Sequence, residues 1–184
     1  MRADAQRSLD ALLQAAKTVF ATSGVDAPIR EIAEKAGVGL GTLYRHFPQR
    51  SDLIAAVFRR EIDACADAAS ALSTEYEPFE ALANWMQRYA EFVATKRGLA
   101  NALHSGDPAF DGLMSHFDRT LRPAVQQLVA AAAAAGEIRA DIDADEFLAA
   151  AASLCMSTYN AGPGRAERMV ALLVDGLRHG APRR

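Results

Sequence analysis

A short segment near the N-terminus concentrates side chains that can donate hydrogen bonds to an anion. Thr42, Tyr44, Arg45 and His46 supply two hydroxyls, a guanidinium and an imidazole within five residues. Side chains of these kinds make many of the hydrogen bonds that proteins form with DNA phosphates. No nucleophile–base pair, phosphate-binding loop or metal-ligand spacing accompanies them, so an enzyme is not predicted. The segment indicates binding to a polyanion rather than catalysis.

The residues around this segment predict two short helices joined by a glycine turn. Apolar spacing predicts one helix over 29–36, and Gly37 can take the left-handed conformation that ends it. A second short helix is predicted over 40–47, and Pro48 disfavours its continuation. This is the pattern of a helix-turn-helix, whose second helix fits the DNA major groove. The two helices would be held at a steep angle by four apolar residues: Ile32, Ala33, Val38 and Leu43.

The remainder of the chain predicts helices and no convincing strand. We expect an all-α protein of about nine helices. Residues 1–50 would form a three-helix, helix-turn-helix DNA-binding domain, and residues 51–184 a second, helical C-terminal domain. The other predicted helices cover 9–23, 52–72, 79–95, 98–104, 107–135 (opened by Asp107-Pro108 and passing through Pro123), 143–159 (opened by an Asp143/Glu146 capping box) and 165–179.

Composition and charge agree with a globular protein that offers one end to DNA. The chain is 51% hydrophobic with a net charge of −3. Residues 1–60 hold nine Lys or Arg against six Asp or Glu, whereas the rest holds eleven against seventeen. Cys65 and Cys155 match no ligand spacing and are interpreted as buried thiols, so no metal or cofactor is predicted. No signal peptide or membrane span is predicted, and we expect a cytoplasmic protein.

The same residues resemble the TetR family of bacterial transcriptional regulators. The resemblance covers about a third of the chain, residues 9–60. The rest is similar to the family in layout only, which implies that residues 51–184 form a C-terminal ligand-binding and dimerisation domain. Residues 99–107 and 136–139 are similar to actinobacterial members. The matching motifs are Phe20-Ala-Thr-Ser-Gly24, Ile32-Ala33, Ala36-Gly37-Val38, Gly41-Thr-Leu-Tyr-Arg-His-Phe47 and Leu53.

The resemblance implies a role for each residue of the helix-turn-helix. Sequence would be read by residues that face bases or the groove wall: Arg30, Leu40 and Arg45. Phosphates would be held by Thr42, Tyr44, His46 and Arg50, the last at a position where the family usually has lysine. Gly39 is a departure, because the family often has serine there, and the hydroxyl contact is lost.

Each of these roles has a simpler alternative. Tyr44 and Phe47 could be core aromatics of a small helical bundle, and for Phe47 this is the interpretation we favour. Arg30 and His46 could be ordinary surface residues. The arrangement within the motif favours DNA contact for Arg30, Tyr44 and His46.

The C-terminal part carries apolar residues that could line an effector pocket or simply form a core. His104, His116 and Asp107 could add polar or metal contacts, but their spacing fits no ligand motif. The candidate pocket residues are Trp85, Met86, Tyr89, Phe92, Leu103, Phe110, Met114, Phe117, Met156 and Tyr159.

The last two predicted helices are expected, by the resemblance, to pair with those of a second copy. The alternative is that they pack only within the subunit. A dimer would place two recognition helices about one DNA turn apart, so a near-palindromic operator is expected. The candidate dimer residues are Phe147, Ala150, Ala151, Leu154, Thr158, Met169, Leu172, Leu173 and Gly176.

The sequence thus predicts a homodimeric DNA-binding regulator, a repressor released from its operator by a small apolar or amphipathic ligand. The alternative is a ligand-independent architectural or protein-bridging module. A solid core and DNA binding that no metabolite changes would favour that alternative.

Overall fold

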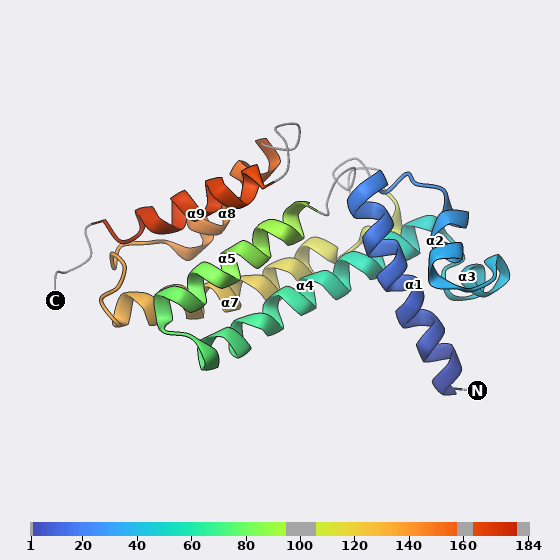
Figure 1. The fold of residues 1–184 in the computed structure, drawn as a ribbon, viewed down its shortest axis with the longest axis horizontal. Coiled ribbons are helices and arrows are strands. Elements are labelled where there is room, and N and C mark those ends of the chain that lie inside the picture. Colours follow the sequence, from blue (N-terminus) through green and yellow to red (C-terminus); the bar gives the residue numbers. More distant parts are fainter. Residues whose placement is uncertain (1, 95–105, 158–163, 180–184) are drawn as a thin grey trace. The chain divides into compact units, whose positions relative to one another are not determined.

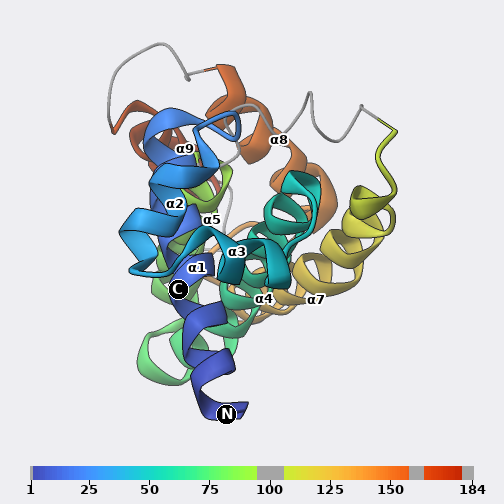
Figure 2. The same cartoon turned by 90° about the vertical axis from the view of Figure 1, so that its right-hand side faces the viewer.

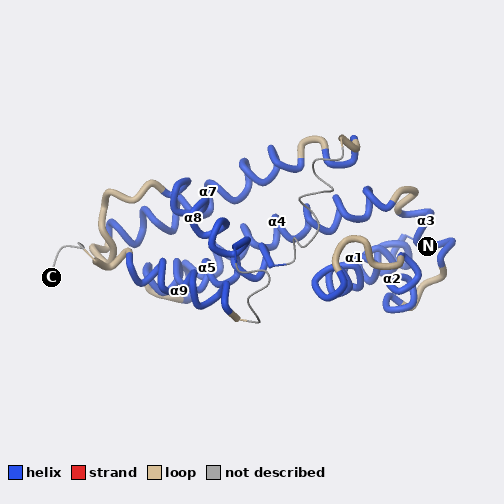
Figure 3. Tube along the Cα trace, turned by 90° about the horizontal axis from the view of Figure 1, so that it is seen from above, coloured by secondary structure: helices blue, strands red, loops and turns tan. Residues whose placement is uncertain are grey.

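The structure, a computed structural model, describes residues 2–94, 106–157 and 164–179, and every regular element in this part is a helix (Figures 1 and 3). The all-α prediction is therefore confirmed. None of the described helices combines the length and the apolar character needed to cross a bilayer. The elements are α1 (Arg2–Ser23), α2 (Ile29–Ala36), α3 (Leu40–His46), α4 (Arg50–Glu75), α5 (Pro78–Ala94), the 3₁₀ helix η1 (Pro108–Phe110), α7 (Leu113–Ala134), α8 (Ala144–Ser157) and α9 (Arg165–Gly176).

The helices pack into two compact units. The N-terminal unit contains the described residues of 1–60 and 95–114, and the C-terminal unit those of 61–94 and 115–184. The division falls inside α4, so that helix runs through both units. This division by packing differs from the predicted division of roles at residue 50, which stays a prediction.

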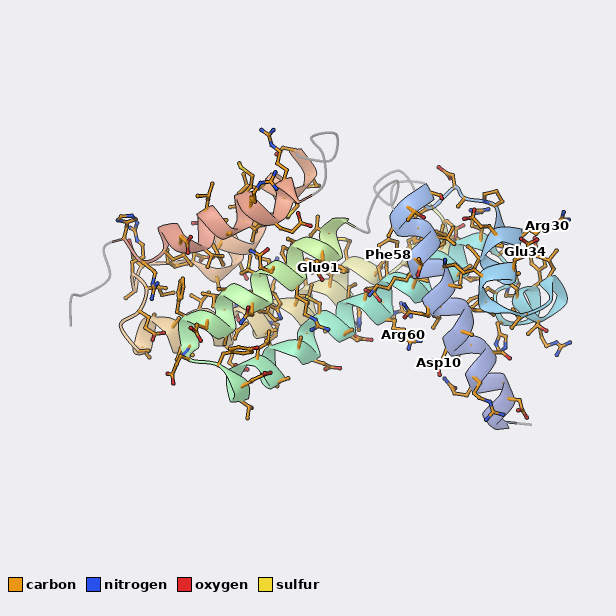
Figure 4. The ribbon with its side chains drawn as sticks, viewed as in Figure 1. Asp10, Arg30, Glu34, Phe58, Arg60 and Glu91 are labelled. Carbon is orange, nitrogen blue, oxygen red and sulfur yellow. The ribbon has the colours of Figure 1, made fainter. Side chains whose placement is uncertain are left out.

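The N-terminal unit is built on the helical spacing of its apolar residues. On α1 these residues recur every three or four positions, and the resulting stripe packs on α2 and α3. On the surface of the unit, Arg60 of α4 donates to the Asp10 carboxylate of α1 at 2.8 Å (Figure 4). The most deeply buried side chains are Leu12, Ala16, Val19 and Phe20 on α1, Ile32 and Ala33 on α2, Leu43 on α3, and Leu53 and Phe58 on α4.

The C-terminal unit packs α5 against α8 and α9. Trp85 is fully buried, and its indole N–H donates to the Cys65 carbonyl of α4 at 2.8 Å. This bond satisfies a polar atom that would otherwise cost free energy in the core. At the start of α5, the Phe79 N–H donates to the Glu137 carboxylate at 2.7 Å. A carboxylate at this end of a helix satisfies a free N–H and interacts favourably with the helix dipole.

The predicted single helix over 107–135 is wrong in its first turns. Asp107 does cap a helix, because its carboxylate accepts from the Ala109 N–H at 2.9 Å, but that helix is only the short η1. Gly112 then adopts a left-handed conformation with φ +75°, which interrupts the helix before α7 begins at Leu113. Pro123 lies within α7, as predicted. The predicted helix over 98–104 lies outside the described residues.

The predicted start of α8 is confirmed. The Asp143 carboxylate accepts from the N–H groups of Asp145 (2.8 Å) and Glu146 (2.9 Å). These bonds satisfy donors that the helix itself leaves free at its first turn. The capping residue therefore marked the start of this helix correctly.

Candidate DNA-binding site

The turn between α2 and α3 is set by one glycine. Gly37 has φ +67° and ψ 28°, a conformation that side chains rarely tolerate. Its N–H donates to the Glu34 carbonyl, and the Val38 N–H donates to the Ala33 carbonyl, both at 3.1 Å. This pair of bonds is a Schellman motif, which closes α2 abruptly and sends the chain directly into α3.

The next glycine opens α3 without any such requirement. Gly39 is extended, with φ −72° and ψ 151°, and its carbonyl accepts from the N–H groups of Thr42 (2.9 Å) and Leu43 (3.1 Å). A Cβ built at Gly39 or at Gly41 would meet nothing within 4 Å. Space inside the chain therefore does not demand glycine at either position.

α3 packs near α1 and α2 (Figure 2) and presents one buried and one accessible face. Leu43 is fully buried and Phe47, just after the helix, is 7% exposed, so both hold α3 on the core. Phe47 is thus the core aromatic that the sequence favoured. Tyr44 is 49% exposed and Arg45 is also exposed, whereas Leu40, Thr42 and His46 are half-buried. The core-aromatic alternative for Tyr44 is not supported.

The predicted donors are available to a partner. The side chains of Arg30, Thr42, Tyr44, Arg45 and His46 form no hydrogen bond or ion pair with any described residue. The imidazole of His46 lies near the Phe47 ring, with 6.3 Å between the centroids. Arg30, in the first turn of α2, points away from the helices (Figure 4). The structure therefore brings these donors onto α3 and the first turn of α2.

Arg50 is the predicted contact that the structure shows otherwise engaged. Its Nη1 atom donates to the carbonyl of Val25 at 2.6 Å and to that of Ala27 at 2.8 Å. The guanidinium thus ties the start of α4 to the loop that precedes α2. A guanidinium has further N–H groups, so a phosphate contact by Arg50 stays a prediction. Sequence reasoning missed the tie, because nothing local in the sequence marks two carbonyls of a distant loop.

The predicted effector residues divide between the two units. In the C-terminal unit, Trp85, Met86, Tyr89 and Phe92 are at most 4% exposed. The rings of Trp85, Tyr89 and Phe92 form a row that continues to the ring of Phe117. Burial raises the pKa of the Tyr89 hydroxyl, and the nearby Cys155 and Cys65 raise it further.

The other predicted effector residues are placed differently. Met156 is 53% exposed, and Met114 is 56% exposed. Met114 and the buried Phe110 belong to the N-terminal unit. Leu103 and Tyr159 lie outside the described residues. The structure therefore groups only the α5 aromatics with Phe117, and their alternative role as ordinary core stays open.

The predicted dimer residues are equally mixed. Phe147 is 5% exposed and Ala151 is fully buried, so both pack inside the C-terminal unit, and a dimer contact by either stays a prediction. Leu172 is 68% exposed. Ala150 and Gly176 are exposed, Leu154, Met169 and Leu173 are half-buried, and Thr158 lies outside the described residues.

Neither cysteine is placed as a ligand. Cys65 and Cys155 are both buried, as the sequence predicted. Burial raises the pKa of the Cys155 thiol to about 11, and the nearby Glu167 carboxylate contributes to the rise. Among the residues that the structure describes, no group of three or more His, Cys, Asp or Glu is arranged to hold a metal ion.

Comparison with known proteins covers both parts of the chain. Residues 12–57 match the family profile described as bacterial regulatory proteins of the tetR family. Residues 77–179 match the profile of the C-terminal domain of SbtR-like transcriptional regulators. An HTH-type transcriptional regulator of Staphylococcus aureus is 28% identical over 109 residues, which are 58% of this chain. The match spans 59% of the length of that relative.

Solved structures match over nearly the whole chain. A TetR transcriptional regulator of Streptomyces coelicolor is 39% identical, with a TM-score of 0.78, over 94% of this chain and 99% of its own. A TetR regulatory protein of Mycobacterium vanbaalenii is 37% identical, with a TM-score of 0.70, over 96% of this chain and 98% of its own. The chain therefore belongs to the TetR family of bacterial regulatory proteins, which are DNA-binding transcriptional regulators and not enzymes.

Proposed function

We propose that this protein is a repressor that binds a near-palindromic operator as a homodimer and is released by a small apolar or amphipathic effector. The observation that carries the DNA-binding part is the set of hydrogen-bond donors on α3 that no described residue engages. Thr42, Tyr44 and His46 would hold phosphates and fix the register of α3 in the major groove. Arg30, Leu40 and Arg45 would face bases or the groove wall.

The dimer part rests on the surface of α9. Leu172 is 68% exposed although it is a large apolar residue, and the half-buried Met169 and Leu173 neighbour it. Pairing with a second copy would remove this surface from water. Leu172→Glu is therefore expected to give monomers in analytical ultracentrifugation. The matched control is Gln127→Glu on α7, an exposed position outside α8 and α9, which is expected to leave the dimer intact.

The effector part rests on the buried aromatic row of α5. Apolar pockets with a few polar groups are the usual form of small-molecule sites. LfrR of Mycobacterium smegmatis, 23% identical with a TM-score of 0.70 over 97% of this chain and 98% of its own, was solved with proflavine bound. That likeness concerns the fold alone, so the effector of this chain is proposed only by class. An effector can shift operator binding only by its difference in affinity for the two states.

The experiment that tests the proposal has two stages. Fragments of genomic DNA that bind the purified protein are selected and sequenced, and we expect near-palindromic sites. Apolar and amphipathic metabolites are then added to the complex with a selected site, and we expect one class to release the DNA. Failure to enrich any sequence would contradict the DNA-binding part. If DNA sites are enriched but no compound of the panel releases them from the protein, the result would favour the ligand-independent module.

A further inference from the structure

The four residues Gly136-Glu-Ile-Arg139 follow α7 and bond to two helices that are remote from them in sequence. We call them the α7–α8 cap segment. The Gly136 N–H donates to the Ala133 carbonyl at 2.9 Å, and the next N–H of the segment donates to the Ala132 carbonyl at 3.0 Å. These bonds form a Schellman motif, for which Gly136 takes the left-handed conformation with φ +71°. The motif ends α7 sharply and fixes the direction in which the segment leaves it.

The second residue of the segment caps α5. The Glu137 carboxylate accepts from the Phe79 N–H at 2.7 Å. Phe79 is the second residue of α5, and the first N–H groups of a helix have no acceptor within it. The negative charge also lies at the end of the helix dipole that favours it. Ile138, the next residue, is fully buried, so apolar packing holds the segment as well.

The last residue of the segment caps α9. The Arg139 N–H donates to the Leu177 carbonyl at 3.0 Å. Leu177 is the C-cap residue of α9, and carbonyls at that end of a helix have no donor within it. The Arg139 guanidinium instead forms two hydrogen bonds of 2.6 Å with the Asp141 carboxylate. The contact with α9 is therefore made by the backbone, and it depends on the path that the segment takes.

The same two helix ends also contact each other directly. The guanidinium of Arg178, just after α9, lies over the Phe79 ring, 4.1 Å from its centroid, where a cation is attracted to the ring. Phe79 is 8% exposed and Leu177 is 6% exposed, so both helix ends are buried. Farther along, Gln87 of α5 donates to the Glu167 carbonyl in the first turn of α9 at 3.3 Å. The two helices therefore lie side by side and antiparallel, with the cap segment at one end of the pair.

The end of α9 lies close to the surface that the proposed dimer uses. The exposed Leu172 stands five residues before Leu177, which is little more than one helical turn. If the end of α9 lost its cap, this part of the helix would fray or shift. Pairing would then have to order the helix in both subunits, and ordering on association lowers affinity.

We infer that the α7–α8 cap segment positions the dimer surface of α9 by capping α5 and α9 together. The inference rests on the proposed function and names a residue that supports its dimer part. Glu137 would be a positioning residue, because it acts on the partner subunit only through α5 and α9. A sequence motif that DNA binding leaves unexplained thereby gains a role.

Three variants test the inference. Glu137→Ala removes the acceptor of the Phe79 N–H, and Arg178→Ala removes the cation over its ring. Glu137→Gln is the conservative variant, because an amide keeps an acceptor oxygen. The matched control is Glu91→Ala, an exposed glutamate of α5. A second control, Ile62→Val, removes a buried methyl group from α4 and so lowers the stability of the same unit.

The dissociation constant of the dimer is measured by analytical ultracentrifugation over a dilution series, and amide hydrogen exchange is measured over 78–82 and 172–179. Glu137→Ala is expected to raise exchange in both ranges, although its carboxylate bonds only to the first. We expect its dissociation constant to rise roughly tenfold, because the lost cap affects both subunits. Arg178→Ala should change both quantities in the same direction.

The conservative variant and the controls separate positioning from general stability. Glu137→Gln and Glu91→Ala should stay close to the unmodified protein in both measurements. Ile62→Val should lower the melting temperature but leave the dissociation constant and exchange over 172–179 unchanged.

Three results would overturn the inference. The first is a rise in exchange of Glu137→Ala confined to 78–82, with an unchanged dissociation constant, which would make the cap local to α5. The second is an equal rise in the dissociation constant of Ile62→Val, which would show an effect of general stability. The third is equal impairment of Glu137→Gln and Glu137→Ala. If the unmodified protein sediments as a monomer, the proposed dimer fails, whereas exchange over 172–179 still decides whether the segment holds α9.

Discussion

The variant Tyr44→Phe removes one hydroxyl from the recognition helix α3 and so tests DNA contact independently of folding. Tyr44 is 49% exposed, and its hydroxyl bonds to no described residue. Tyr44→Phe should therefore change the free energy of unfolding by less than about 0.5 kcal/mol, as is usual at such surface sites. Any larger effect on DNA binding must then come from a contact made only in the complex.

The size of that effect follows from the proposed contact. A hydrogen bond to a charged group contributes about 1.5 kcal/mol at the low end of its usual range. A dimer loses two such bonds, so the total is about 3 kcal/mol, which is about a 100-fold loss of affinity. Tyrosine carries no charge at neutral pH. The dependence of affinity on salt concentration should therefore keep its slope, because the number of neutralised phosphates is unchanged.

The assay is a fluorescence-anisotropy titration of selected DNA at several salt concentrations, with thermal unfolding in parallel. Tyr76→Phe, which removes the same atom from an exposed tyrosine before α5, is the matched control and should bind normally. Unchanged affinity of Tyr44→Phe would refute the assigned contact. A loss of affinity accompanied by a lower melting temperature would show instead that the hydroxyl stabilises the fold.

Three further predictions concern other sites. Gly39→Ser should raise the free energy of unfolding by a few tenths of a kcal/mol, and with it the melting temperature, because the extended backbone has room for a capping hydroxyl. A lower melting temperature would contradict the open space at this position. Glu137→Ala should lower the free energy of unfolding in urea by about 1 kcal/mol, because the Phe79 N–H loses its acceptor. The control Glu91→Ala, on the exposed face of α5, should lower it little. Equal losses in the two variants would contradict the capping role of Glu137. Cys155 should resist iodoacetamide at pH 8 in the folded protein and react in urea, because burial raises its pKa to about 11; rapid labelling of the folded protein, followed by peptide mapping, would contradict this.

Local sequence patterns predicted the helix-turn-helix well. The helix over 29–36 was confirmed at both ends, and the helix over 40–47 was confirmed to within one residue. Such success has a local cause, because Gly37 and the spacing of Ile32 and Leu43 act over a few residues. The single helix predicted over 107–135 is interrupted for a local reason. Gly112 follows the Asp107 cap so closely that only a 3₁₀ turn fits between them.

Burial within one chain was harder to predict from spacing. Phe147, Ala151 and Leu172 lie on helices that the resemblance implied would pair with a second copy, yet of these three only Leu172 is exposed. Periodicity shows that a helix has an apolar face, but it cannot show which other helix covers that face. The same limit applies to Trp85 and Tyr89, whose spacing suits a pocket and a core equally.

The sequence by itself determined the helical class, the recognition helix and the donors Thr42, Tyr44, Arg45 and His46, because these depend on residues close together in the chain. Tertiary structure alone decided which of those side chains form no hydrogen bond with a described residue, and that Arg50 binds the carbonyls of Val25 and Ala27. It also decided that residues 106–114 pack with the N-terminal helices. Contacts of this kind join residues far apart in the chain, and they form only when buried apolar faces bring those residues together.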